Sequence, residues 1–77
     1  MKKLVILGST GSIGTQALEI AAGSEELQVV GLAAASSWER LLGQARDHGV
    51  PTVALGDEEA AGRARAQWSG RVLAGEE

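Results

Sequence analysis

A loop with glycine at every third position is the feature that most constrains the fold of this chain. The glycines are Gly8, Gly11 and Gly14, and the apolar run 4–7 directly precedes them. A short apolar run that ends at glycine is typical of a strand buried on both faces of a parallel sheet. After the loop, apolar residues recur at helical spacing until Gly23, a stop signal. The pattern predicts a strand, a tight loop and a helix.

The rest of the chain continues this alternation. Strands are expected over 27–34 and 52–55, and the run 71–73 is a candidate start of a fourth. Gly31, inside the second strand, indicates a close backbone approach. One helix follows each of the first three strands. The expected apolar faces are Ile13, Ala17, Ile20 and Ala21 in the first helix, Trp38, Leu41, Leu42 and Ala45 in the second, and Ala60, Ala61, Ala64 and Trp68 in the third.

Two of these helices carry start signals. Ser36 and Glu39 match a Ser-x-x-Glu capping box, and Asp57 is placed to cap the third helix. Gly49 ends the second helix. Gly43 lies inside that helix at a cost of about 1 kcal/mol relative to alanine, so we expect packing that requires a small residue there.

The order of elements predicts an α/β fold: a Rossmann-type parallel sheet with flanking helices and right-handed crossovers. A doubly wound dinucleotide fold has two βαβαβ halves, and residues 1–77 supply the first half. The first strand would then lie at a sheet edge, although its composition is that of a central strand. We therefore expect residues 1–77 to be the N-terminal part of a nucleotide-binding domain that continues in the native protein.

Composition limits the possible partners. The net charge is −3 and the seven Lys and Arg residues are scattered, which argues against nucleic-acid binding. No cysteine is available for a disulfide framework or a thiolate metal site, as is usual in a reducing compartment. The N-terminal apolar run stops at Leu7, too short for a secretory signal, and no run approaches the about 18 residues of a membrane span. We expect a cytoplasmic protein with no membrane partner.

The glycine loop has the properties of a phosphate-binding loop. Gly8 allows a tight exit from the strand, Gly11 lets the backbone approach a pyrophosphate, and Gly14 lets the helix pack closely on the sheet. The amides of residues 10–13 and the positive end of the helix dipole would face the phosphates. Hydroxyl groups that could add hydrogen bonds are those of Ser9, Thr10 and Ser12.

Two other interpretations of the loop stay open. A flexible Gly-Ser turn without a ligand has the same glycine spacing, and so does a loop for a methyl-donor cofactor. A Walker A loop is excluded because no Gly-Lys-Ser/Thr ending is present.

The end of the second predicted strand distinguishes NAD from NADP. Enzymes that prefer NAD usually place Asp or Glu about 20 residues beyond the loop, where it binds the ribose hydroxyls. Here the residues are Ala34, Ala35, Ser36 and Ser37, which lack a carboxylate that would repel a 2′-phosphate. The helix start and the two serine hydroxyls could hold that phosphate, and Arg40 could pair with it. We predict NADP, with helix capping as the alternative role of the serines.

The string Leu7-Gly8-Ser9-Thr10-Gly11-Ser12-Ile13-Gly14-Thr15 resembles the opening of the 1-deoxy-D-xylulose 5-phosphate reductoisomerase family, and the likeness extends to about residue 55. These NADPH-dependent oxidoreductases of the non-mevalonate isoprenoid pathway convert 1-deoxy-D-xylulose 5-phosphate into 2-C-methyl-D-erythritol 4-phosphate. The second loop departs from the basic residue and asparagine that the family often has there. The resemblance implies phosphate contacts by Thr10, Gly11, Ser12 and Ile13, and an adenosine ribose lined by Ala35, Ser36 and Ser37.

The resemblance also implies components outside residues 1–77. The family's sugar-phosphate substrate and its divalent metal, Mg or Mn, are held by a downstream carboxylate motif and a separate catalytic domain. We therefore expect residues 1–77 to bind the cofactor without catalytic activity, and the full-length enzyme to be a homodimer. A semialdehyde or dihydrodipicolinate type reductase and a non-catalytic NAD(P)-sensing module are the alternatives.

The remaining conspicuous residues are expected to be structural. His48 lies near a helix end, where a cation is favoured, and it has no neighbouring His or Cys. The acidic run 57–59 fits the first turn of a helix. Trp38 and Trp68 are expected in the core, and the pair at 63 and 65, both Arg, on a solvated face.

Overall fold

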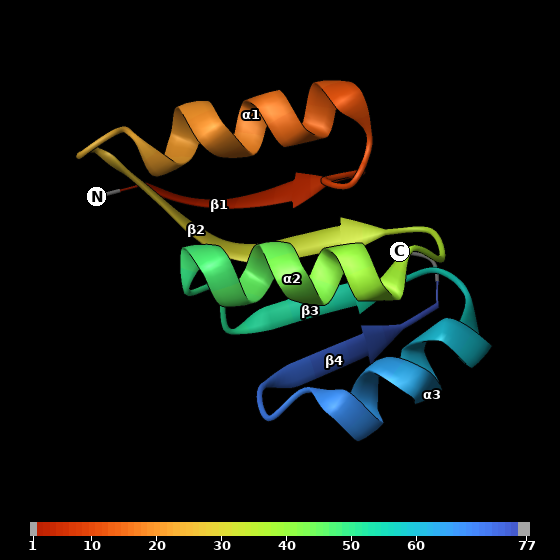
Figure 1. The fold of residues 1–77 in the computed structure, drawn as a ribbon. Helices are drawn as coiled ribbons and strands as arrows, with labels where there is room; N and C mark the ends of the chain where they lie inside the picture. Colours follow the sequence, from red (N-terminus) through yellow and green to blue (C-terminus); the bar gives the residue numbers. More distant parts are fainter. Residues whose placement is uncertain (1, 76–77) are drawn as a thin grey trace.

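Strands and helices alternate along the whole described chain (Figure 1). A computed structural model describes residues 2–75. Its elements are β1 (Lys2–Leu7), α1 (Ser12–Ala22), β2 (Leu27–Ala34), α2 (Trp38–His48), β3 (Thr52–Leu55), α3 (Glu58–Gln67) and β4 (Arg71–Ala74). This order confirms the predicted alternation, including the fourth strand.

The four strands form one parallel sheet in the order β1-β2-β3-β4. Each helix packs against the two strands that it connects. Right-handed crossovers between successive neighbours place every helix on the same face of a sheet with this order. The predicted fold class is confirmed, and β1 lies at an edge of the described sheet as expected.

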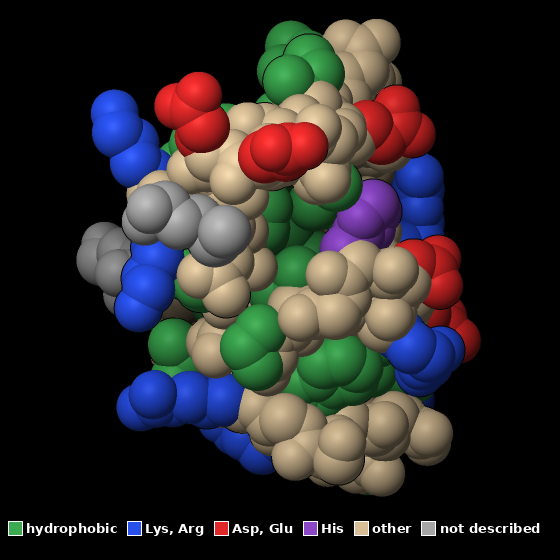
Figure 2. Space-filling view, turned by 90° about the vertical axis from the view of Figure 1, so that its left-hand side faces the viewer, with side chains coloured by type: hydrophobic (Ala, Val, Ile, Leu, Met, Phe, Trp, Pro, Cys, Tyr) green, Lys and Arg blue, Asp and Glu red, His purple; other side chains and the backbone are tan. Residues whose placement is uncertain are grey.

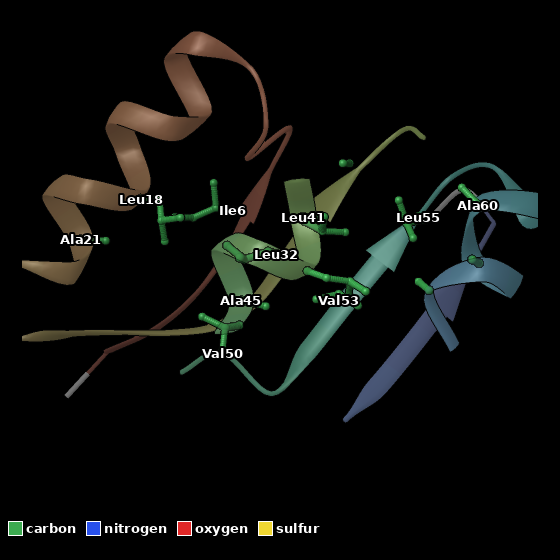
Figure 3. Packing of buried hydrophobic residues seen from close by; sticks show 14 residues of the cluster. Ile6, Leu18, Ala21, Leu32, Leu41, Ala45, Val50, Val53, Leu55 and Ala60 are labelled. Carbon is green, nitrogen blue, oxygen red and sulfur yellow. The ribbon is translucent and has the colours of Figure 1, made fainter. Parts of the chain in front are cut away.

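The hydrophobic core lies between the helices and one face of the sheet (Figure 3). Ile6 of β1 and Leu18 of α1 point toward each other, and Val53 and Leu55 of β3 contribute further along the sheet. These side chains alternate with others that point to the opposite face. The buried apolar residues are Ile6, Leu18, Ala21, Leu32, Ala34, Leu41, Leu42, Ala45, Val50, Val53, Leu55, Ala60, Ala61 and Ala64.

No helix among residues 2–75 covers the opposite face of the sheet, so β1 is buried on one face only in the described structure. Val5 and Leu7 are 60% and 72% exposed. An open groove of about 860 Å³ runs along this face, lined by small and apolar residues of all four strands and of the loops at their ends. The apolar composition of β1 thus shows that the strand suits burial, while the crossovers of this chain cover only one side of it.

The face of α1 that packs on the sheet also differs from the prediction. Ile13 and Ile20 are 84% and 73% exposed and Ala17 is exposed, whereas Leu18 and Ala21 are buried. Only Ala21 of the four expected residues faces the core. The helix is turned by about one residue from the predicted orientation, because it approaches the preceding loop through Gly14, which shares a stripe with Leu18 and Ala21.

The starts of α2 and α3 are built differently. Asp57 caps α3 as predicted, because its Oδ2 accepts a hydrogen bond of 3.0 Å from the amide of Ala60. The prediction of a capping box formed by Ser36 and Glu39 at the start of α2 is wrong. The N-cap is Ser37, whose ψ of 66° departs from the extended backbone usual at this position, and within the described residues its side chain makes no capping bond. Gly49 ends α2 in the left-handed conformation, with φ +67°, as expected.

Two glycine predictions are corrected by the packing around them. A Cβ on Gly43 would meet no described atom within 4 Å, so no packing constraint accounts for a small residue there. A Cβ on Gly31 would lie 3.3 Å from Cγ2 of Val5, so the close neighbour is a side chain and not the backbone. Next to Gly31 the β1–β2 register shifts between Leu4 and Val5, so the strand pairing is irregular at this glycine.

The conspicuous surface residues mostly have structural contacts. Trp38 and Trp68 are half-buried against the core, and Trp68 follows α3 and donates from Nε1 to the carbonyl of Pro51 at 3.2 Å. Arg63 pairs with Glu59 on the exposed side of α3. Lys and Arg lie at several separate places on the face in Figure 2. Within residues 2–75 no helix has the length and apolar character needed to cross a bilayer.

The two helix starts predict losses of different size when the N-cap residue is replaced by alanine. Asp57→Ala should lower the free energy of unfolding by about 1 kcal/mol, because it leaves the amide of Ala60 without its cap. Ser37→Ala should change it by less than about 0.3 kcal/mol, because no side-chain cap is lost. Urea unfolding of both variants measures the difference, and an equal loss in the two would contradict these starts.

Candidate phosphate-binding site

The glycine loop leaves the carboxyl end of β1 and is tied to the neighbouring strand. The amide of Ser9 donates to the carbonyl of Ala33 at 3.0 Å, which extends the β1–β2 pairing by one residue. The amide of Gly11 donates to the carbonyl of Gly8 at 3.0 Å and closes a tight turn. The loop therefore has a defined backbone course before α1 begins at Ser12.

The three glycines are required for different reasons. Gly8 has φ +67°, a conformation that other residues adopt only with strain. A Cβ on Gly14 would lie 2.7 Å from the carbonyl carbon of Gly8 and 2.8 Å from Cα of Ser9, too close for any side chain. Gly11 has φ −81°, and a Cβ there would meet its nearest neighbour at an ordinary 3.5 Å. The fold needs glycine at positions 8 and 14, but not at 11.

The N-terminus of α1 is equipped for an anion. The amides of Ser12, Ile13 and Gly14 lie in the first turn, where a helix has no partners for them, and no described group accepts from them. No acidic residue lies in this turn, in contrast to Glu39 in α2 and Glu58 in α3. The helix dipole adds a partial positive charge at the same place.

Two expected phosphate ligands are engaged elsewhere. The amide of Gly11 is used by the turn to Gly8, so it does not belong to the set of free amides. The hydroxyl of Ser9 is fully buried and donates to Oε1 of Gln44 at 2.9 Å, so it is not available to a ligand. Ser12 is exposed and Thr10 is half-buried, and in the described structure neither hydroxyl is bonded.

Sequence reasoning missed Gln44. It lies half-buried on α2. Among the described residues, its side chain is the only one outside the β1-loop-α1 unit that forms hydrogen bonds with this unit. Its single signal in the sequence is position: an amide three residues after Leu41, beside the apolar stripe of the helix. Such a residue is also common on solvated helix faces, so the position does not reveal the contact.

Most of the predicted phosphate-loop residues share one hollow. A groove of about 460 Å³ opens beside the loop at the β1 edge. Its predicted members are Gly8, Gly11, Ser12, Ile13 and Gly14. Ser9 and Thr10, whose hydroxyls were also expected to face the phosphates, do not line it.

The second predicted loop is exposed next to the larger groove. Ala35 lines that groove together with Gly8, which also borders the phosphate-side groove. Ser36 and Ser37 are exposed but do not line it, and Arg40 is exposed without an ion pair to any described residue. Among residues 2–75 no three His, Cys, Asp or Glu side chains gather into a metal-binding group.

Replacing each of the three loop glycines by alanine should lower the free energy of unfolding by a different amount. Gly8→Ala should destabilise the chain by about 1 to 2 kcal/mol because of its φ, and Gly14→Ala by at least about 2 kcal/mol because of overpacking. Gly11→Ala should leave the free energy of unfolding within about 0.5 kcal/mol of the parent. Denaturant unfolding of the three variants measures this order, and a large loss for Gly11→Ala would contradict the described loop.

The chain resembles known proteins along nearly its whole length. The sequence model of the 1-deoxy-D-xylulose 5-phosphate reductoisomerase family matches residues 4–77. The enzyme of that name from Mycobacterium marinum is 54% identical over 61 residues, which are 77% of this chain and 15% of the relative. The one from Leifsonia xyli subsp. xyli is 56% identical over 57 residues, 73% of this chain and 16% of the relative. The chain thus spans about a sixth of the length of these curated relatives.

Solved structures show the same fold. The 1-deoxy-D-xylulose 5-phosphate reductoisomerase from Zymomonas mobilis in complex with NADPH matches 96% of this chain and 21% of its own, with a TM-score of 0.82 and 24% identity. A DOX-P reductoisomerase in complex with magnesium matches 97% of this chain and 20% of its own, with a TM-score of 0.74 and 22% identity. The fold is thereby shown, and the match over residues 4–77 establishes that the chain belongs to the 1-deoxy-D-xylulose 5-phosphate reductoisomerase family.

Proposed function

We propose that this chain binds NADPH through the loop from Gly8 to Gly14. The proposal rests on one observation about Gly11: neither its backbone conformation nor the packing around it requires glycine at this position. Glycine at such a position leaves room for the close approach of a ligand to the backbone. A turn that merely joins a strand to a helix has no need of it.

The loop would hold the pyrophosphate of the cofactor. The amides of Ser12, Ile13 and Gly14 supply donors, and the dipole of α1 supplies a favourable potential. Gly11 keeps the approach to these amides clear of side chains. Bound NADPH supplies a hydride for reduction, and the contribution of these residues is to bind and orient the cofactor.

The loop after β2 would hold the adenosine end of the cofactor. Ala35, Ser36 and Ser37 are exposed at the carboxyl end of β2, where ligands bind in open α/β sheets. The loop itself has no carboxylate, and Arg40 in the first turn of α2 is unpaired among the described residues. Glu39 beside it carries the opposite charge, so we expect the preference for the 2′-phosphate to be moderate.

For the activity we propose the reaction of the family, the isomerisation and NADPH-dependent reduction of 1-deoxy-D-xylulose 5-phosphate to 2-C-methyl-D-erythritol 4-phosphate. The family match favours this over the semialdehyde and dihydrodipicolinate type reductases that share the glycine loop. We further propose that the sugar phosphate and the divalent metal are bound outside residues 1–77, that these residues alone are inactive, and that the enzyme acts as a homodimer.

Substitution of Gly11 tests the cofactor site directly. Gly11→Val should weaken NADPH binding at least about tenfold, because a branched side chain would stand between the phosphates and the amides of α1. Isothermal titration measures the affinity, and Gly62→Val, in open space on α3, is the matched control. If Gly11→Val is folded and binds NADPH like the parent, the site assignment is wrong.

The choice of dinucleotide tests the second loop. NADPH should bind about tenfold more tightly than NADH, because one charge-assisted hydrogen bond to the 2′-phosphate contributes about that much affinity. Arg40→Ala should remove most of this difference without changing the affinity for NADH. Arg65→Ala, an exposed arginine on α3, serves as the control. Equal affinities of the parent chain for the two dinucleotides would refute the preference.

A further inference from the structure

Gln44 joins α2 to the phosphate-binding loop, across 35 residues of sequence, through both atoms of its amide group. Its Oε1 accepts from the hydroxyl of Ser9 at 2.9 Å, and its Nε2 donates to the carbonyl of Ser9 at 2.7 Å. The same Nε2 lies 3.4 Å from Oγ1 of Thr15. Two bonds from one planar amide to one residue fix both the position and the orientation of that residue.

Ser9 is held at every polar atom. Its amide donates to Ala33, its hydroxyl to Gln44, and its carbonyl accepts from both Gln44 and the hydroxyl of Thr15, the latter at 3.0 Å. Its side chain is the one buried polar side chain of the described core. A buried hydroxyl and carbonyl are costly when unpaired, so the contact with Gln44 is a strong constraint on the loop.

This constraint acts inside the turn of the loop. Ser9 directly follows Gly8, which tolerates many backbone conformations, and lies within the turn that the bond from the Gly11 amide to the Gly8 carbonyl closes. The course of these residues decides where the first amides of α1 point. A donor array binds an anion more tightly when it is already in position, because less conformational entropy is lost on binding.

We propose that Gln44 is a positioning residue for the cofactor: by clamping Ser9 it holds the loop in the conformation that presents the amides of Ser12 to Gly14 to the pyrophosphate. It acts through Ser9 and does not contact the cofactor. Because Gln44 lies on the helix that follows Ala35 to Ser37, it also ties the two cofactor loops into one unit. The inference rests on the proposed binding of NADPH.

The test compares Gln44→Met with Gln67→Met in the full chain. Methionine has a similar length but makes neither bond to Ser9, and Gln67 is an exposed glutamine on α3 with no hydrogen bond to the loop. In the ligand-free chain, NMR-detected hydrogen exchange of the Ser9 and Gly11 amides should become about tenfold faster in Gln44→Met. Gln67→Met should leave these rates unchanged.

Binding is measured on the same proteins. Gln44→Met should bind NADPH about tenfold more weakly, while its affinity for adenosine 2′-monophosphate, which has no pyrophosphate, stays within about twofold. A purely structural role would lower the unfolding temperature without this difference between the two ligands. Ser9→Ala removes only the hydroxyl bond and should weaken NADPH binding less, by about threefold, and it supplies the test if Gln44→Met does not fold.

The outcomes separate this inference from the proposed function. A double variant of Ser9→Ala and Gln44→Met that binds NADPH no more weakly than Gln44→Met alone supports the clamp. Unchanged NADPH affinity in a folded Gln44→Met overturns the inference, whatever the exchange rates, and leaves the proposed function standing. If the parent chain does not bind NADPH, the proposed function is wrong, and so is the role of Gln44 in cofactor binding. Faster exchange of the loop amides in Gln44→Met would then show only that Gln44 holds the loop.

Discussion

The close approach of α1 to the loop at Gly14 is the contact on which the site and part of the core depend. Because no side chain fits between Gly14 and the backbone of Gly8 and Ser9, the helix begins directly against the loop. Its orientation then follows: Leu18 and Ala21 face the sheet, and Ile13 is turned outward. The same contact brings the first amides of the helix to the carboxyl end of β1. One steric constraint thus sets both the packing of α1 and the direction of the proposed phosphate site.

The uncovered face of the sheet results from the topology. Successive strands are neighbours, so the crossovers place the helices on one side, and Val5 and Leu7 point into an open groove on the other. That groove reaches Gly8 and Ala35 at the carboxyl ends of the strands. The apolar surface and the proposed cofactor loops therefore meet at one end of the sheet, as is usual for ligand sites in open α/β folds.

The elements were predictable because their signals are local. Strands 27–34 and 52–55 have the predicted bounds, the cap at Asp57 is formed, and Gly49 ends α2 in the expected conformation. The errors concern packing. The helix begins after Ser37 and not after Ser36 of the predicted capping box, and the ψ of Ser37 is not the extended one usual for an N-cap. The buried side of α1 depends on a contact with the preceding loop.

The sequence by itself determined the strand-loop-helix unit and the positions of its three glycines, because the roles of Gly8 and Gly14 arise between residues a few positions apart. Only the tertiary structure showed that the hydroxyl of Ser9 and the amide of Gly11 are used within the protein and that Gly11 has no packing role. It also revealed Gln44. A hydrogen bond between residues 35 positions apart leaves no periodic or spacing signal, since it depends on how α2 is placed beside the loop by the sheet.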